Sequence, residues 1–364
     1  MTRGAPSVRL HAVAAIFAVV GVSLGVAALA KIGPAETAFP SGELDLPSRE
    51  PLPASDTLMA DADAGNLPDL LAGVVADGEN PTADMDVTDA SPAARVDVQP
   101  LSSPEALPPA PIAEVHTAST SGLVPMRSPS GRTAFRAYAR PFDDGGAPNL
   151  SIVVGGLGID AELTDRAVRE LPPEVTLAFA AHAPDLQGRV DLARAFGHEV
   201  VLEIPMEGRD SDPGEPGASR RLRPGDGARN LQNLDYLLSR ASGYFAVMPY
   251  KGDTFLARSD ASAPILSKLE SSGLGFLSDP QLNVPTLPSA AGAVGLPYRA
   301  GTMLVDEVPE RERILADLEA LKTRALAGEQ PVGFAFTYPE TLDALVEWTR
   351  TLEGVELAPV SSSF

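Results

Sequence analysis

The sequence predicts an α/β domain over residues 149–364, with a mainly parallel sheet and helices outside it. Short β-forming apolar runs alternate with amphipathic helical patterns throughout this region. The first unit, NLSIVVGGLGID at Asn149–Asp160, reads as a buried strand, a glycine turn and a helix N-cap. Seven or eight such units in about 210 residues fit a (β/α) barrel, open or closed, better than a five-stranded open sheet.

The predicted strands are Leu150–Val154, Val175–Phe179, Val200–Ile204, Tyr244–Met248, Leu274–Leu277, Met303–Val305, Val332–Phe336 and Glu356–Pro359. The predicted helices are Asp160–Glu170, Leu186–Phe196, Asn230–Arg240, Ala261–Ser271, Arg311–Ala327 and Glu340–Leu352. Ligands bind at the carboxyl ends of the strands in folds of this kind, so the loops after the strands are where a site is expected.

The N-terminal segment predicts membrane targeting. Leu10–Ala30 is apolar over the length that a helix needs to cross a bilayer. Arg3 and Arg9 precede it, which favours a cytoplasmic N-terminus and a single-pass inner-membrane anchor, with the C-terminal domain in the periplasm. A signal peptide cleaved after Ala28–Ala30 is the alternative, and both interpretations predict that the rest of the chain is exported.

The charge is distributed unevenly between the membrane segment and the domain. Residues 1–31 carry a net charge of +3, residues 32–126 carry −14 and residues 127–364 carry −10. Residues 32–126 are rich in Pro, Ala, Ser and Asp, which predicts a disordered acidic linker. Residues 127–148 predict an arm that packs on the domain. Because phosphate binding needs a clustered basic face, this charge pattern argues against a nucleic-acid partner.

The opening glycines raise the question of a dinucleotide site. Gly156, Gly158 and Ala161 satisfy the G-x-G-x-x-G/A spacing between a strand and a helix. That site also needs an acid at the end of the second strand, and none precedes Asp185 there. The glycines are therefore better explained by a tight turn between strand and helix.

Carboxylates near the ends of several strands suggest acid–base chemistry. Glu203 and Glu207 lie in GHEVVLEIPME, while Asp253 and Asp279 follow the next two strands. A carboxylate on a buried strand is unfavourable unless it is paired or functional, so Glu203, Asp253 and Asp279 are the candidate catalytic residues. For Glu203 and Glu207 the alternative is a salt bridge to an arginine of the loop 208–227. That loop carries four arginines that could cover the site and attract an anionic or sugar ligand.

Metal chemistry has few candidate ligands in this domain. It contains no cysteine, and its only histidines are His182 and His198. His198 precedes its strand and is expected to be structural. A histidine-ligated zinc hydrolase is therefore not predicted, and no metal or other cofactor is assigned to the chain.

Several segments together resemble the divergent polysaccharide deacetylase family. The resemblance covers roughly residues 149–362 and rests on IVVGGLG, LPPEVTLAFAAHAPD, GHEVVLEIPME, the turn at Gly252, GLGFLSD, FTYPETLDAL and APVS. It implies the distorted (β/α)7-type barrel of the glycoside hydrolase and deacetylase kind. It also implies removal of N-acetyl groups from a glycan with the help of a divalent metal such as zinc.

The chain departs from the family pattern at the residues that the metal chemistry would need. Gly155 and Gly156 stand where the family has two aspartates, and Glu203 where it has a histidine or glutamine. An Asn-Asn-His element falls on Met248–Tyr250, and the histidine of a Gly-His-Pro element falls on Phe336. The candidate substrate-binding positions that the resemblance and the strand ends leave are Gly155, Gly156, Met206, Glu207, Tyr250 and Lys251.

The function expected from these observations is that of a membrane-anchored, exported, polysaccharide deacetylase-like protein of carbohydrate metabolism. It lacks metal-dependent deacetylation and acts in glycan binding or in the cell envelope. The expected partners are a cell-wall or envelope glycan and an envelope protein. Two alternatives stay open: a hydrolase of N-acetylated glycans that uses Glu203, Asp253 and Asp279, and an envelope scaffold.

Overall fold

A computed structural model describes residues 106–364 of the protein. The predicted membrane segment Leu10–Ala30 and most of the predicted linker lie outside these residues. Within residues 106–364, no helix has both the length and the apolar character required to cross a bilayer.

The centre of the domain is a parallel sheet. In spatial order its strands are β8 (Tyr298–Ala300), β7 (Gly275–Ser278), β6 (Ala246–Lys251), β5 (Val200–Met206), β4 (Thr176–Ala180), β3 (Asn149–Leu157), β10 (Val332–Phe336) and β9 (Met303–Leu304). A short strand, β11 (Glu356–Leu357), pairs with the beginning of β3. The parallel sheet of repeated strand–helix units predicted from the sequence is confirmed.

The two outer strands of this sheet are neighbours in the chain. β8 pairs with β7 and β9 pairs with β10, and only Gly301 and Thr302 lie between β8 and β9. The Gly301 amide donates to the Ser278 carbonyl at 2.7 Å, and the Thr302 amide donates to the Val332 carbonyl at 2.8 Å. One extended segment thus changes its partner from β7 to β10, and the sheet must curl to bring both within reach. The result is a barrel-like α/β fold.

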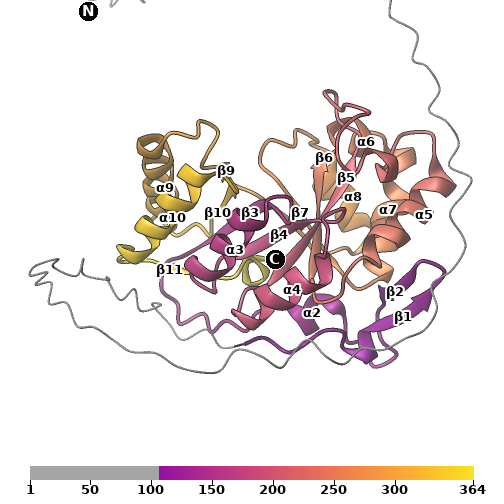
Figure 1. Cartoon of the computed structure of the whole chain (residues 1–364), viewed down its shortest axis with the longest axis horizontal. Helices are drawn as coiled ribbons and strands as arrows, with labels where there is room; N and C mark the ends of the chain where they lie inside the picture. The colour runs from indigo at the N-terminus through magenta and orange to yellow at the C-terminus, as the bar shows by residue number, and fades with distance from the viewer. Residues whose placement is uncertain (1–105) are drawn as a thin grey trace, which may run out of the picture. The chain divides into compact units, whose positions relative to one another are not determined.

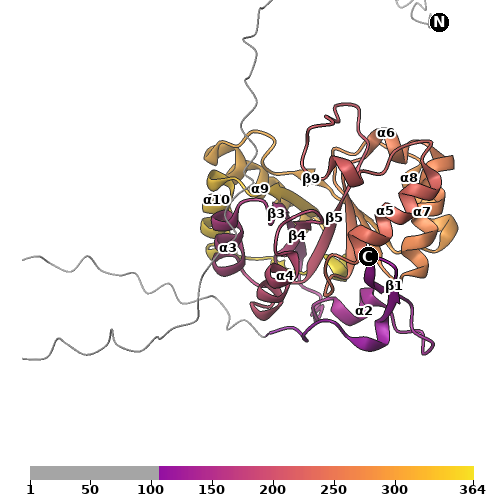
Figure 2. The same ribbon diagram turned by 45° about the vertical axis from the view of Figure 1, so that its right-hand side comes forward.

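Helices cover the outside of this curled sheet, as Figures 1 and 2 show. They are α3 (Ala161–Glu170), α4 (Leu186–Ala195), α5 (Gly227–Leu238), α7 (Ser259–Ser271), α8 (Leu287–Val294), α9 (Arg311–Leu326) and α10 (Pro339–Arg350), with the single turn α6 (Asp253–Leu256). Strands β4 and β5 are buried along their whole length because helices cover one face and side chains fill the other.

The first strand–turn–helix unit forms in the predicted order, but its strand runs through Gly155 and Gly156 to Leu157 and does not end at Val154. Strand β3 ends at Leu157, and Asp160 caps α3 by accepting a hydrogen bond from the Leu163 amide at 2.9 Å. Gly158 has a φ of +91°, and a Cβ there would lie 2.6 Å from Ala183. The turn therefore needs glycine for its backbone conformation and for close packing, and no phosphate is required to explain it.

The first described residues pack against the amino end of the sheet. A hairpin of β1 (His116–Ser119) and β2 (Gly122–Pro125) is followed by the short helix α2 (Ala134–Tyr138). The buried Arg194 guanidinium on α4 donates to the carbonyls of Pro108, Tyr138 and Gly243 at 3.0 to 3.2 Å. Residues 106–126 therefore have defined structure, although the sequence placed the end of the linker at residue 126.

Some boundaries differ from the sequence-based expectation. Strand β6 continues past Met248 to Lys251, so Tyr250 and Lys251 belong to the strand and not to the loop after it. Strand β8 and the helices α6 and α8 were not predicted. They are short, and β8 gains its partner only through the curvature of the sheet.

Candidate functional site

The carboxyl ends of the strands surround two adjoining hollows. One has a volume of about 320 Å³ and is lined by Gly156, Ile159, Asp160, Ala180, His182, Glu203, Pro205, Pro216, Tyr250, Phe336, Thr337 and Tyr338. The other is lined by Glu203, Arg209, Asp210, Met248, Pro249, Tyr250, Lys251, Asp253, Asp279, Gln281, Leu282 and Phe336. Three side chains face both hollows: Glu203 from β5, Tyr250 from β6 and Phe336 from β10.

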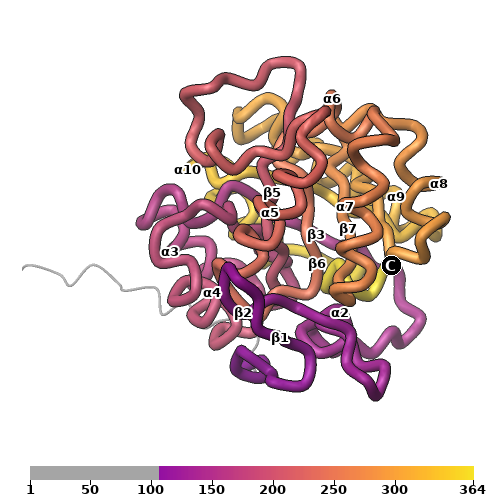
Figure 3. The backbone as a smooth tube through the Cα atoms, turned by 90° about the vertical axis from the view of Figure 1, so that its right-hand side faces the viewer, coloured from indigo at the N-terminus to yellow at the C-terminus, as the bar shows by residue number. Residues whose placement is uncertain are grey.

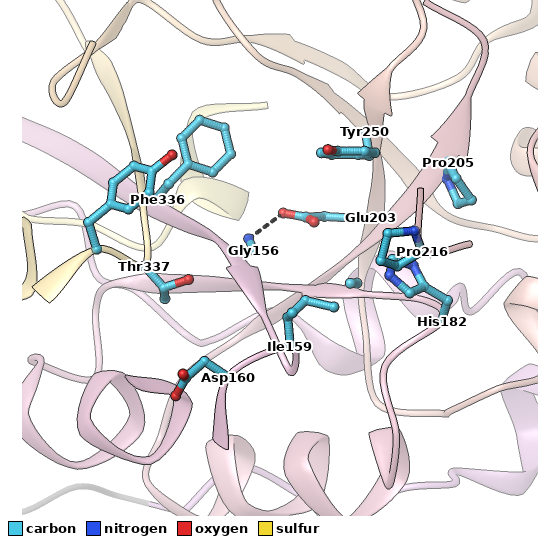
Figure 4. A pocket seen from close by; sticks show the side chains of 12 residues that line it. Gly156, Ile159, Asp160, His182, Glu203, Pro205, Pro216, Tyr250, Phe336 and Thr337 are labelled. Atoms are coloured by element: carbon cyan, nitrogen blue, oxygen red, sulfur yellow. Dashed lines mark hydrogen bonds between the residues drawn. The ribbon is translucent and has the colours of Figure 1, made fainter. Parts of the chain in front are cut away.

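Glu203 lies at the centre of this arrangement, and Figure 4 shows its carboxyl group directed toward Gly156. It is 4% exposed, and its Oε1 accepts a hydrogen bond from the Gly156 amide at 2.8 Å. A Cβ on Gly155 would lie 2.7 Å from the same Oε1. The glutamate therefore fills the space that a side chain at residue 155 would need.

Burial raises the pKa of Glu203 to about 7, and the negative charge of Asp279 adds to that shift. The Gly156 amide opposes the shift because it stabilises the ionised carboxylate. Oε2 has no hydrogen-bond partner among residues 106–364, and the residue lines both hollows. Glu203 can therefore gain or lose a proton near neutral pH while it faces a ligand.

Asp279 follows β7 and lines the second hollow. Burial raises its pKa, while the Gln281 amide donates to its Oδ1 at 2.5 Å and lowers it. Neither Asp279 nor Glu203 forms a salt bridge with a residue in the range 106–364. The structure thus brings all three candidate catalytic carboxylates to the second hollow, and two of them, Glu203 and Asp279, have no counter-ion among the described residues.

Asp253 differs from these two carboxylates because it is already paired. The Arg209 guanidinium donates to its Oδ2 at 2.8 Å, and this interaction holds the pKa of Asp253 below its usual range. Lys251 is paired as well, with Glu215 at 2.5 Å and Asp210 at 3.5 Å. Lys251 has a φ of +60°, an unfavourable backbone conformation for a residue with a side chain, at the edge of the second hollow.

Met206 and Glu207 lie below the hollows and line neither. Met206 is buried, and its Cβ packs within 3.1 Å of the place where a Gly252 Cβ would stand. Glu207 forms salt bridges to Arg221 at 3.8 Å and Arg223 at 3.4 Å, both from the loop after β5. The alternative of a salt bridge to that loop therefore holds for Glu207, whereas Glu203 forms none there.

The loop 208–227 lies at the carboxyl end of the sheet, opposite the β1–β2 hairpin (Figure 3). Pro216 lines the first hollow and Arg209 the second. Arg209, Arg221 and Arg223 pair with carboxylates, while Arg220 stacks 4.2 Å from the Tyr236 ring centroid. These interactions weaken the expectation that the arginines attract an anionic ligand, because each guanidinium already has a partner within the protein.

Three residues of the site were not predicted from the sequence. His182 lines the first hollow, and neither ring nitrogen has a hydrogen-bond partner among residues 106–364. Burial lowers its pKa, so the imidazole is neutral. Ile159 and Tyr338 are 54% and 46% exposed at the rim. His182 could have been noticed in the sequence, because it is a histidine that follows soon after the second predicted strand. Exposed apolar residues carry no comparable signal in one sequence.

A fourth unpredicted residue, Asp306, fixes the position of Phe336. Its Oδ2 accepts hydrogen bonds from the Phe336 amide at 2.6 Å and the Thr341 hydroxyl at 3.1 Å. His198 is structural, as expected: its ring nitrogens contact the carbonyls of Val175 at 2.8 Å and Val168 at 3.1 Å.

Comparison with known proteins places the domain in a family. Residues 152–364 match the model of the divergent polysaccharide deacetylase family. The chain belongs to this family. It is also similar to an uncharacterized protein from Agrobacterium tumefaciens of known structure, with 32% identity and a TM-score of 0.64. That match covers 67% of this chain and 100% of the other.

The similarity to other solved structures is too weak to support an inference about this chain. A dihydropteroate synthase from Xanthomonas albilineans is 13% identical, with a TM-score of 0.25 and coverage of 56% of this chain and 93% of that one. No curated protein matches the chain. The family assignment therefore rests on the family model and on the Agrobacterium structure.

The metal that the family resemblance implies does not fit the residues of this member. Within residues 106–364, no group of three or more His, Cys, Asp or Glu side chains is placed to hold a metal ion. Gly155 and Gly156 offer no side-chain donor, and Glu203 already accepts a hydrogen bond from the Gly156 amide. No step of a reaction is therefore assigned to a metal.

Proposed function

We propose that this domain binds a glycan of the cell envelope without metal-dependent deacetylation. The observation that carries the proposal is the position of Glu203, whose carboxyl group fills the space beside Gly155. The family resemblance expects a metal-activated water in this region, and the chain offers a hydrogen-bonding carboxyl group and aromatic rings instead.

The rim of the hollows suits a sugar ring. Tyr250 and Tyr338 are 40% and 46% exposed, and Phe336 lies between the two hollows. Aromatic faces pack against the apolar faces of sugar rings, while Glu203 and the backbone offer hydrogen bonds to hydroxyl or amide groups. The aromatic rings provide contact area for the sugar, and the hydrogen bonds fix its orientation.

The place where the chain enters the domain agrees with a binding domain on a tether. The Leu107 amide donates to the Arg194 carbonyl at 2.9 Å, at the end of α4 that precedes β5. The described chain therefore enters at the amino end of the sheet and leaves the hollows uncovered. If Leu10–Ala30 anchors the protein in the inner membrane, the hollows face the periplasm and its glycans or an envelope protein.

Isothermal titration of the purified full-length chain with N-acetylated and de-N-acetylated glycan oligomers tests this proposal. Binding of one of them is expected in the presence of a chelator, with at least ten-fold weaker binding when Tyr250→Ala removes an aromatic face. The control Tyr236→Ala removes a tyrosine outside both hollows and leaves binding unchanged. Loss of binding on addition of the chelator contradicts the proposal.

A second candidate function is metal-free hydrolysis with Glu203 as the general base. The pKa of about 7 at a buried carboxyl group beside a hollow favours it. Asp253 does not join this candidate machinery because Arg209 neutralises it. Release of acetate that disappears in Glu203→Gln supports hydrolysis and contradicts a purely binding role.

A further inference from the structure

One buried and one half-buried carboxyl group, both without a counter-ion in the described part of the chain, face the same hollow. Glu203 on β5 is 4% exposed, and Asp279 follows β7, two strands away in the sheet. Strand β6 runs between them and carries Tyr250 and Met248 to the same hollow. Bringing two like charges into a partly buried site is unfavourable unless a cation or a proton compensates them.

The cations of the same region are not available for this compensation. Arg209 pairs with Asp253 at 2.8 Å, and Lys251 pairs with Glu215 at 2.5 Å. An anionic ligand consequently finds no unpaired positive group in this hollow, whereas a cationic ligand finds two unpaired carboxyl groups. The Oε2 atom of Glu203 is the point of attachment because Oε1 already accepts from the Gly156 amide.

Aromatic rings flank the carboxyl groups. Tyr250 and Phe336 line both hollows, and Tyr338 lines the first. Aromatic faces attract cations and pack against apolar ring faces, and together with carboxylates they form the usual environment of an amine ligand. A simple inorganic cation would gain little from these rings.

We propose that the hollow between Glu203 and Asp279 binds the primary ammonium group of an amino sugar, as found in a de-N-acetylated glycan. This inference rests on the proposed glycan binding and selects its ligand class. The ammonium group donates to Glu203 and Asp279, while the sugar ring packs on Tyr250 and Phe336. The domain thus recognises glycan from which acetyl groups have already been removed by an N-deacetylating reaction.

The proposal predicts a pH dependence with a maximum near pH 7. The ammonium ligand needs Glu203 ionised, which favours pH above its pKa of about 7, and it needs its own proton, which favours lower pH. The titratable and charged side chains that line the two hollows with Glu203 are Asp160, His182, Arg209, Asp210, Tyr250, Lys251, Asp253, Asp279 and Tyr338. Among them, Asp279 is the charged group whose repulsion raises the pKa of Glu203.

The test is isothermal titration of the full-length chain with a glucosamine tetramer and with its fully N-acetylated counterpart, both at pH 7. We expect the glucosamine tetramer to bind at least ten-fold more tightly. The Glu203→Gln variant keeps the shape and the hydrogen bond to Gly156 but removes the charge, so this preference disappears. The control Glu162→Gln removes an exposed carboxylate outside both hollows and keeps the preference.

A second control addresses the acidity of the whole chain, whose net charge is −21. Tetralysine carries four side-chain amino groups, the same number of amino groups as the glucosamine tetramer, but no sugar ring. If tetralysine binds as tightly as the glucosamine tetramer, the preference is generic attraction and the proposal is wrong. If only the N-acetylated tetramer binds, this inference fails while the proposed glycan binding stands, and if neither sugar binds, both fail.

Discussion

Gly155 and Glu203 occupy complementary space, and this pair sets the chemistry of the site. A Cβ at residue 155 would lie 2.7 Å from Oε1 of Glu203 and 3.5 Å from the Phe336 ring. A side chain at residue 155 and the present position of Glu203 therefore exclude each other. Glycine at residue 155 is therefore the residue that the present position of Glu203 requires.

Substitution of Gly155 by alanine tests this linkage. Gly155→Ala is expected to lower the free energy of unfolding by about 1–3 kcal/mol, because Glu203 must leave the Gly156 amide. Adding Glu203→Ala removes the clash, so a double-mutant cycle in urea should give a coupling energy of about 1 kcal/mol or more. Gly145→Ala is the matched control, because a Cβ there meets no atom within 4 Å. Additive effects of the two substitutions contradict the linkage.

The raised pKa of Glu203 has a predictable effect on stability. Burial raises this pKa from 4.5 to about 7, so the folded protein binds more protons than the unfolded chain between these values. Stability contributed by Glu203 is therefore highest at low pH and falls as pH rises through this window. Glu203→Gln cannot ionise and should gain about 3 kcal/mol relative to the wild type between pH 4 and pH 8. The measurement is urea unfolding at both pH values, and a pH-independent difference contradicts the assignment.

At the scale of elements, the amino end of the sheet depends on one buried arginine. Arg194 on α4 contacts three carbonyls from separate segments, and its guanidinium lies 4.9 Å from the Tyr138 ring centroid. Burial lowers the pKa of Arg194 to about 10, and at neutral pH it stays charged. Its charge is satisfied by carbonyl dipoles, so it fixes the arm to the domain.

Arg194→Met keeps an unbranched apolar stem but removes the donors to Pro108, Tyr138 and Gly243. The free energy of unfolding should fall by about 3 kcal/mol, because two buried carbonyls and a partly buried one lose a charged partner. Limited proteolysis should also cut residues 106–140 faster than in the wild type. Arg189→Met is the control, since that guanidinium contacts a surface carbonyl at Pro184. Unchanged cleavage in Arg194→Met would show that the arm is held by other contacts.

Sequence patterns predicted the elements that have strong periodicity or caps. The strand–turn–helix unit at Asn149–Asp160, the alternation of strands and helices along the chain and the burial of Glu203 on β5 could all be predicted. The hairpin β1–β2 could not, because its residues resemble the linker and its support comes from a distant helix, where the Ser239 hydroxyl at the end of α5 donates to the Ser121 carbonyl at 3.0 Å. The sequence offered a salt bridge from Glu207 to the loop 208–227 as an alternative, but the pairing of Asp253 with Arg209 was not predictable, because it depends on how that loop folds back.

At the scale of the whole domain, the residues that hold the N-terminal arm and the two hollows lie at opposite ends of the curled sheet. The arm and the residues around Arg194 lie at the amino end, while both hollows lie at the carboxyl end. The two halves of the wall are joined by the segment from β8 to β9, which exchanges β7 for β10 at Gly301. The shape of the hollows therefore depends on close packing at that glycine.

Gly301→Ala tests this dependence. A Cβ at Gly301 would lie 2.6 Å from the Phe334 ring and 2.7 Å from Pro280, so β8 or β9 must shift. The free energy of unfolding should fall by about 2 kcal/mol, with weaker ligand binding because Pro280 follows Asp279. Gly292→Ala on α8 meets no atom within 4 Å and should stabilise the protein by about 0.5–1 kcal/mol. Equal effects of both substitutions in chemical unfolding contradict the role of Gly301.

If the domain functions as proposed, its site needs no metal of the kind that the family resemblance implies. A zinc titration of the purified full-length chain, followed by calorimetry and paired with an assay of acetate release from N-acetylated glycans, tests it most directly. We expect no stoichiometric zinc binding that depends on Glu203, and no acetate release. One tightly bound zinc per chain, together with acetate release that is lost in Glu203→Gln and on addition of a chelator, would contradict it.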